Sequence, residues 1–292
     1  MKKLILLLCL TSFVVTSVPS PVWAKDYSKY SNSTVEFGLN LRKDHKKPTC
    51  EKPKGIKKIS KYDAYYYDIN AYKKKDKVIY LSFDCGYENG NTKRILNTLK
   101  KKKVKAIFFV TERYIKKTTK LVKRMKKEGH LVGNHSCNHP RMTELSVKKM
   151  KKEIKQCART MKKRTGYEMD PYFRPPEGVY SQRVMKVTQD LGYYTVFWSL
   201  PLYDYEVDDQ PGADYVVKKF KDHHFCGMIP ILHVISSSDR KALPRLIKTM
   251  KKKGYRFGSL DEFIPDKKAE KKKEDKKDNK DNKEKKAEEK KK

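Results

Sequence analysis

The sequence of 292 residues lacks the paired cysteines of a disulfide framework. It has six Cys, and Cys9 falls within an apolar segment at the N-terminus. The others are widely spaced: Cys50, Cys85, Cys137, Cys157 and Cys226. An odd number of cysteines without tight spacing does not make a complete set of disulfides. At least one thiol is therefore expected to stay free or to bind something.

Long apolar runs are also scarce. The run over residues 4–15 is shorter and more broken than a typical membrane span. It follows the basic start Met1-Lys2-Lys3 and leads to the small residue Ala24, which is the pattern of a secretory signal peptide. Residues 1–24 are therefore predicted to be a signal peptide, and the protein to be secreted or cell-wall associated. An uncleaved N-terminal membrane anchor is the alternative.

Acidic residues are half as numerous as basic ones, 35 against 70. Residues 266–292 hold 14 Lys and 9 acidic residues with no large apolar side chain, so we predict that this tail is disordered. The tail contributes +5 and residues 1–24 contribute +2, which leaves +28 on residues 25–265. Such a surface attracts polyanions. Predicted export and the absence of a nucleic-acid-binding motif favour anionic cell-wall polymers over nucleic acid. Solvated lysines without any specific partner are the simpler alternative.

Between residues 77 and 264 the pattern alternates short apolar runs with helical spacing. Strands are expected near residues 78–83, 104–110, 131–132, 172–173, 193–198, 228–234 and 255–257. Apolar residues spaced three and four apart between these runs predict helices, several of which end at a glycine. Repeated strand–helix units predict an α/β domain over residues 77–265, with a parallel sheet covered by helices. Residues 25–76 show no clear period and are predicted to form an N-terminal arm.

Polar side chains follow four of the expected strands. Asp84 ends the first run, His135 and His139 follow a later one, Arg174 precedes two prolines, and His233 ends the run ILH. In a parallel sheet these strand ends share one edge, where sites form. If 135–139 were a helical turn, its two His would share a face and hold one metal ion. Each feature alone is also compatible with an ordinary turn or a solvated side chain.

Taken together, the segments SFDCG, HSCNH, RPPEG, Asp204-Tyr205 and ILH resemble the carbohydrate esterase family 4 (NodB-type) polysaccharide deacetylases. The resemblance covers roughly residues 35–264. The segments FDCGYENG, GHLVGNHS and GYYTVFWSL are similar to one branch, the delta-lactam-biosynthetic N-acetylmuramic acid deacetylases of spore cortex formation. The family fold is a distorted barrel of about seven β/α units.

The resemblance implies a reaction: metal-dependent hydrolysis of an N-acetyl group. Asp84 matches the catalytic base, His233 the acid, Arg174 the partner of Asp84, and Asp204 the partner of His233. His135 and His139 match ligands of a divalent metal, expected to be zinc. The substrate-binding residues implied are Pro176, Glu177, Gly178, Trp198, Tyr205 and Leu232.

The substrate implied is N-acetylmuramic acid in the glycan strand of peptidoglycan, with muramic-delta-lactam as the later product, and a monomer is expected. Two alternatives remain open. One is an N-acetylglucosamine deacetylase acting on peptidoglycan or another polysaccharide. The other is a non-catalytic protein that binds cell-wall glycan.

Three residues depart from the family pattern. Cys85 replaces the second Asp or Asn of the first motif, so it either joins the metal as a thiolate ligand or leaves a two-His site completed by water. Glu177 stands where the muramic branch usually has Arg, which reverses a charge beside the substrate. Tyr205 replaces a Trp and keeps an aromatic wall.

Overall fold

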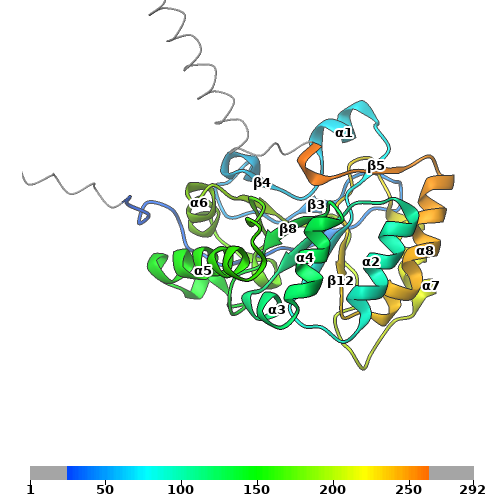
Figure 1. Ribbon diagram of the computed structural model, residues 1–292. Helices are drawn as coiled ribbons and strands as arrows, with labels where there is room; N and C mark the ends of the chain where they lie inside the picture. Colours follow the sequence, from blue (N-terminus) through cyan, green and yellow to red (C-terminus); the bar gives the residue numbers. More distant parts are fainter. Residues whose placement is uncertain (1–24, 263–292) are drawn as a thin grey trace, which may run out of the picture.

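The structure is a computed structural model that describes residues 25–262 (Figure 1). The predicted signal peptide and the lysine-rich tail lie outside the described residues. Within residues 25–262, no helix combines the length and apolar character needed to cross a bilayer.

The centre of the fold is a seven-stranded sheet in the order β12-β6-β7-β8-β9-β11-β4, in which every pairing is parallel. The strands are Ala64–Tyr65 (β4), Ser82–Cys85 (β6), Ile107–Val110 (β7), Leu131–Asn134 (β8), Tyr172–Phe173 (β9), Tyr194–Val196 (β11) and Ile231–His233 (β12). The sheet curls into a half-barrel. Isolated β-bridges such as Leu200 to Pro230 connect the segment after β11 with the segment before β12. The expected α/β fold of the distorted-barrel type is confirmed.

Helices cover the outside of this sheet (Figure 1). They are Ile69–Lys74 (α1), Asn91–Lys102 (α2), Glu112–Lys117 (α3), Thr119–Lys127 (α4), Val147–Thr165 (α5), Gln182–Asp190 (α6), Ala213–His223 (α7) and Ser237–Lys252 (α8). Helix α5 shows why the sequence forms them. Ser146 caps its first turn, Met150, Ile154 and Cys157 bury one face, and Gly166 ends it with φ 82°.

The N-terminal arm, residues 25–76, pairs with strands of the main domain, which its sequence pattern did not predict. Its strand β4 forms an edge of the main sheet, with Ala64 opposite Thr195 on β11. Strand β1 (Val35–Glu36) pairs with β10 (Val179–Tyr180), and β2 (Leu39–Asn40) pairs with β3 (Thr49–Cys50). The expected strand over residues 78–83 is interrupted. Its first part, β5 (Val78–Ile79), leaves the main sheet and pairs in parallel with β13 (Arg256–Phe257).

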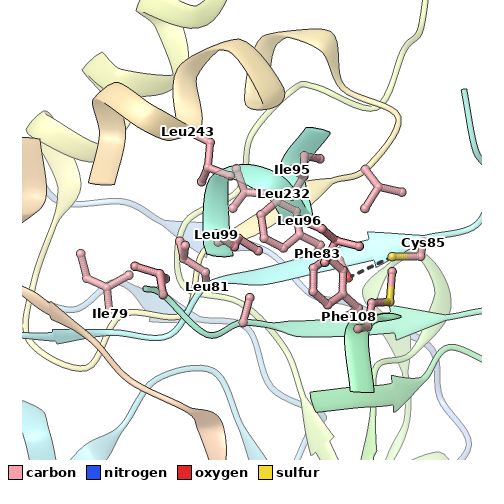
Figure 2. Close-up of a cluster of buried hydrophobic side chains, with 14 of the residues drawn as sticks. Ile79, Leu81, Phe83, Cys85, Ile95, Leu96, Leu99, Phe108, Leu232 and Leu243 are labelled. Carbon is pink, nitrogen blue, oxygen red and sulfur yellow. Dashed lines mark hydrogen bonds between the residues drawn. The ribbon is translucent and has the colours of Figure 1, made fainter. Parts of the chain in front are cut away.

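The two faces of the sheet bury different sets of side chains because neighbours on a strand point to opposite sides. On β6, Phe83 and Cys85 face the helices, in a core that also contains Leu96, Leu232 and Leu243 (Figure 2). A second core packs Ile107 and Phe109 from β7 with other residues on the concave side. The intervening residues of β6, Ser82 and Asp84, do not belong to the helix-facing core. Figure 2 shows Cys85 in this core, where its thiol donates a hydrogen bond to the carbonyl oxygen of Phe83.

Candidate active site

A cavity of about 620 Å³ opens at the carboxyl ends of the sheet strands. Asp84 from β6 and His233 from β12 line it, together with His135 and His139 from the loop after β8. Glu177, Trp198 and Tyr205 complete the part of the wall expected from the sequence. The structure therefore brings polar residues from several strand ends to one place, as parallel strands require.

Asp84 is held by the guanidinium of Arg174, whose Nη1 lies 2.7 Å from Oδ1 of Asp84. Arg174 is wholly buried, and its other donors reach the hydroxyl of Ser82 and the carbonyls of Val196 and Phe197. Burial alone would raise the pKa of Asp84. The charge of Arg174 and the hydrogen bond it donates, with a smaller contribution from His233, together outweigh burial and hold the pKa of Asp84 below its ordinary value. Asp84 is therefore an ionised carboxylate whose Oδ2 remains available.

His135 and His139 meet across a bend that is not the helical turn considered from the sequence. Ser136 and His139 both have positive φ, and the carboxylate of Glu153 accepts the backbone N–H groups of Cys137 and Asn138 at 2.9 Å. The two imidazole rings nevertheless lie with centroids 4.8 Å apart. The bend therefore brings the two imidazole rings together, as a helical turn would have done.

The ring of His135 is fixed in one orientation. Its Nδ1 lies 2.8 Å from the backbone carbonyl oxygen of Arg174, and its Nε2 lies 3.5 Å from Oδ2 of Asp84. A carbonyl can only accept, so Nδ1 carries the proton and Nε2 carries the lone pair. Burial lowers the pKa of His135 to about 4, so the ring is neutral at neutral pH. This is the state and orientation of a metal-ligating histidine.

His233 lies across the cavity and pairs with Asp204. Its Nδ1 is 2.9 Å from Oδ1 of Asp204, a carboxylate with no exposed surface. Burial alone would lower the pKa of His233, but the attraction of Asp204 outweighs it and raises the pKa above the ordinary value. The ring of Tyr205 stands edge-on, 5.9 Å from the ring of His233. His233 is thus set up as a protonated donor at Nε2.

Cys85 does not share this arrangement. Its side chain is fully buried on the helix-facing side of β6 (Figure 2). Asp84, by contrast, lines the cavity. Burial raises the pKa of the Cys85 thiol well above its ordinary value, which opposes the thiolate form that a metal would need. Of the two readings weighed for Cys85, the geometry favours a site that is completed without it.

Leu232 was expected to contact substrate, and the structure contradicts that expectation. Its side chain is fully buried in the same core as Cys85, because it alternates with its neighbours along β12 (Figure 2). Ile231 and His233, one residue to either side, line the cavity instead.

The segment RPPEG forms a tight turn below the aromatic wall. Pro176 and Gly178 are buried, and Glu177 between them has φ 56° and reaches the cavity. Gly178 has φ 68°, and a Cβ there would lie 2.6 Å from Cη2 of Trp198. The glycine therefore lets the Trp198 ring pack against the turn. The guanidinium of Arg141 lies 4.0 Å from the Glu177 carboxylate, which places a charge pair at the rim.

Sequence reasoning missed Tyr87 and Tyr203, which also line the cavity. They are 55% and 68% exposed, and with Tyr205 and Val207 they make up the exposed large hydrophobic residues of the described chain. Tyr87 lies within the segment FDCGYENG, so the resemblance contained a signal for it. Tyr203 lies next to Asp204 and had none.

Residues 25–262 contain no group of three or more His, Cys, Asp or Glu side chains that converge as metal ligands. The donors present are the two imidazoles of His135 and His139. They fit a divalent metal that takes its remaining ligands from solvent or substrate, because Nε2 of His135 faces the cavity with its lone pair.

Comparison with known proteins decides the family. Residues 71–196 match the model for Polysaccharide deacetylase. The chain is 38% identical over 236 residues to the peptidoglycan-N-acetylmuramic acid deacetylase PdaA of Bacillus subtilis, covering 81% of this chain and 88% of that protein. This chain belongs to the polysaccharide deacetylases of carbohydrate esterase family 4.

Solved structures agree with this assignment. The structure of PdaA from Bacillus subtilis, a family 4 carbohydrate esterase, superposes with a TM-score of 0.75 at 37% identity, over 80% of this chain and 98% of that one. A peptidoglycan-N-acetylglucosamine deacetylase of Bacillus cereus is 31% identical over 196 residues, which cover 65% of this chain and 89% of that protein. The chain is thus an enzyme, a hydrolase of the deacetylase class.

Proposed function

We propose that this deacetylase removes the N-acetyl group from N-acetylmuramic acid in the glycan strand of peptidoglycan. The observation that carries the proposal is the pairing of β6 with β12, in which Asp84 stands directly opposite His233. One strand supplies a carboxylate and its neighbour supplies a protonated imidazole, and both face one cavity. Amide hydrolysis needs a base for water and an acid for the departing amine, and these two residues have the required charges.

Asp84 acts through Oδ2. Its Oδ1 is taken by Arg174, so Oδ2 is left to accept a proton from the attacking water. Arg174 keeps the Asp84 carboxylate charged and holds it in one orientation. Asp84 is therefore a well-positioned base of low intrinsic basicity.

His233 acts through Nε2, because Nδ1 is taken by Asp204. The raised pKa of His233 favours the protonated ring near neutral pH. The ring can therefore give a proton to the amine nitrogen, which must be protonated before it leaves. His135 and His139 are the residues that would hold a divalent metal such as zinc. When bound, the metal lowers the pKa of water and polarises the acetyl carbonyl.

The choice of muramic acid is supported by the similarity to PdaA over most of both chains. The product can then close to muramic-delta-lactam, because the lactyl carboxyl of muramic acid can condense with the freed amine and release water. That closure requires muramic acid without its stem peptide. Measuring deacetylation of glycan with and without stem peptides therefore distinguishes N-acetylmuramic acid from N-acetylglucosamine as the substrate. The relative from Bacillus cereus acts on N-acetylglucosamine according to its name.

Secretion remains part of the proposal, together with attraction of the basic body to anionic wall polymers. The support is the pattern of residues 1–24 and the charge of residues 25–265.

The deciding experiment measures acetate released from purified peptidoglycan, with and without added zinc, followed by mass spectrometry of the glycan fragments. We expect zinc-dependent acetate release with deacetylated muramic acid or muramic lactam among the fragments. Asp84→Asn is the matched control, because it keeps the shape of the side chain and removes the base. Deacetylated glucosamine alone would establish the other substrate. No acetate from any wall preparation would contradict the enzyme mechanism.

A further inference from the structure

A third carboxyl group stands behind His233. The backbone N–H of His233 points at two carboxyl oxygens at once, Oδ2 of Asp204 at 3.0 Å and Oδ2 of Asp239 at 3.1 Å. Asp204 is 0% exposed and Asp239 is 1% exposed. Asp239 lies in the first turn of α8, where Ser236 caps the helix by accepting its backbone N–H. Two buried carboxyl groups thus converge on a single donor.

The surroundings offer little to balance two negative charges. Nδ1 of His233 approaches Asp204, not Asp239. Gln210 ties the loop of Asp204 to the start of α8, but its amide meets the backbone oxygen of Asp204 and the Ser236 hydroxyl. Oδ1 of Asp239 has no partner among the hydrogen bonds of the described residues. The amino end of α8 favours a negative charge, but this effect is smaller than the cost of burying a second charge beside the first.

Oδ2 of Asp204 and Oδ2 of Asp239 both lie within 3.1 Å of the same backbone nitrogen, so the two carboxyl groups are close to each other and interact electrostatically. Ionised carboxylates only accept hydrogen bonds, so a bond between two of them requires a proton on one. The proton belongs on the group with weaker support. Asp204 receives the His233 ring and the backbone N–H, whereas Asp239 receives the backbone N–H alone.

We propose that Asp239 is a neutral carboxylic acid whose O–H donates a hydrogen bond to the Asp204 carboxylate and so positions that carboxylate on His233. The inference rests on the proposed role of His233 as the acid. It makes Asp239 a positioning residue that touches neither substrate nor metal. Burial and the charge of Asp204 raise the pKa of Asp239 well above its ordinary value, in keeping with this assignment.

The arrangement sets the strength of the acid. One negative charge beside His233 raises its proton affinity enough to keep it protonated. Two would hold the proton too tightly for release to the amine, because an efficient general acid titrates near the working pH. A protonated Asp239 removes the second charge while keeping its oxygen on the backbone N–H of His233.

The charge of Asp239 is tested by NMR titration of the histidine rings in the full-length protein, with His233 assigned by comparison with His233→Gln. Asp239→Asn reproduces the donor and the acceptor of a neutral acid. We expect it to shift the pKa of His233 by less than about 0.3 units, whereas Asp204→Asn, the positive control, lowers it by about one unit or more. A drop of a unit or more in Asp239→Asn would show an ionised Asp239 and overturn the proposal.

The positioning role is tested by kinetics on glycan substrate. Asp239→Ala removes the donor, and we expect kcat to fall about tenfold or more with little change in KM. Asp239→Asn should restore most of that loss. Equal kcat in the wild type and Asp239→Ala, or an equal loss in both variants, would contradict a role for the donated hydrogen bond. Thermal unfolding identifies a variant that fails to fold. The titration needs no activity, so it decides the charge of Asp239 even if the proposed function fails.

Discussion

Nδ1 of His233 and Oδ1 of Asp204 are 2.9 Å apart, and this pair determines the pH range of the proposed acid. Against the effect of burial, the Asp204 charge raises the pKa of His233 above its ordinary value. Asp204→Asn removes that charge, so we expect the pKa of His233 to fall. The alkaline limb of the kcat/KM profile should move to lower pH, because the protonated ring is the active form. A limb that stays in place would show that another group sets it.

The same pair has a consequence for stability. A histidine with a raised pKa in the folded state contributes stability that is fully present below its unfolded pKa, near 6.5. That contribution is lost as the pH rises through the folded value. The free energy of unfolding of Asp204→Asn should therefore differ from the wild type more at pH 5 than at pH 9, as measured by urea denaturation at both values.

The buried pair of Arg174 and Asp84 is expected to be costly to break on one side. Arg174→Met leaves Asp84 buried without its main partner, and we expect a loss of about 3–5 kcal/mol in the free energy of unfolding. The double variant Arg174→Met with Asp84→Asn should recover part of it, since no unpaired charge remains. Arg141→Met is the control, because the ion pair of Arg141 with Glu36 is exposed to solvent and contributes little to stability.

Cys85 is expected to matter for stability and not for metal binding. Its side chain packs in the core, so Cys85→Ala should cost about 1 kcal/mol of stability and leave zinc affinity unchanged in calorimetric titration. His135→Ala should weaken zinc binding more than tenfold. Cys157→Ala is a matched control, because this cysteine is equally buried. A loss of zinc affinity specific to Cys85→Ala would restore the thiolate-ligand hypothesis.

Tyr87 and Tyr203 are expected to bind sugar rings of the strand beyond the one that is cleaved. Both stand exposed at the cavity, and aromatic rings offer apolar faces against which pyranose rings can pack. Tyr87→Ala and Tyr203→Ala should raise KM several-fold on long glycan and leave kcat on a short oligosaccharide unchanged. Val207→Ala, also exposed but outside the cavity lining, should alter neither. An equal effect on long and short substrates would contradict this role.

Gly178 is expected to tolerate no side chain. Gly178→Ala combines positive φ with a Cβ 2.6 Å from Cη2 of Trp198, so it should lose more than the roughly 1 kcal/mol typical of positive φ alone. Gly166→Ala is the matched control, since its φ is also positive and nothing lies within 4 Å of the added atom. Similar losses in the two variants, compared by thermal unfolding, would show that Trp198 moves aside freely.

The strands that carry Asp84 and His233 were predictable because their apolar runs are strong and the polar residues end those runs directly. Strand β4 was not, since Ala64–Tyr65 is two residues long and takes its place only through pairing with β11. Cys85 and Leu232 both face the core for one shared physical reason. Each alternates with a functional neighbour on a strand, so the residue next to an active side chain faces the core.

The carboxyl cluster around His233 was only half predictable. Asp204 was implied by the family motif, but Asp239 looks from sequence like an ordinary acidic residue in the first turn of a helix. Its meeting with Asp204 depends on how the loop before α7 folds over the start of α8, through Gln210. No local pattern encodes that contact.

The pairing of β5 with β13 also bears on the order in which the molecule can assemble. Val78 stands opposite Arg256, and Ala64 stands opposite Thr195. Strands near the start of the chain therefore pair with strands that are far away in the sequence. Such contacts close large loops before any pairing energy is gained, which slows folding. A chain still being synthesised would hold β5 without its partner until β13 emerges. Fragments that stop short of residue 256 would keep that edge open to other chains.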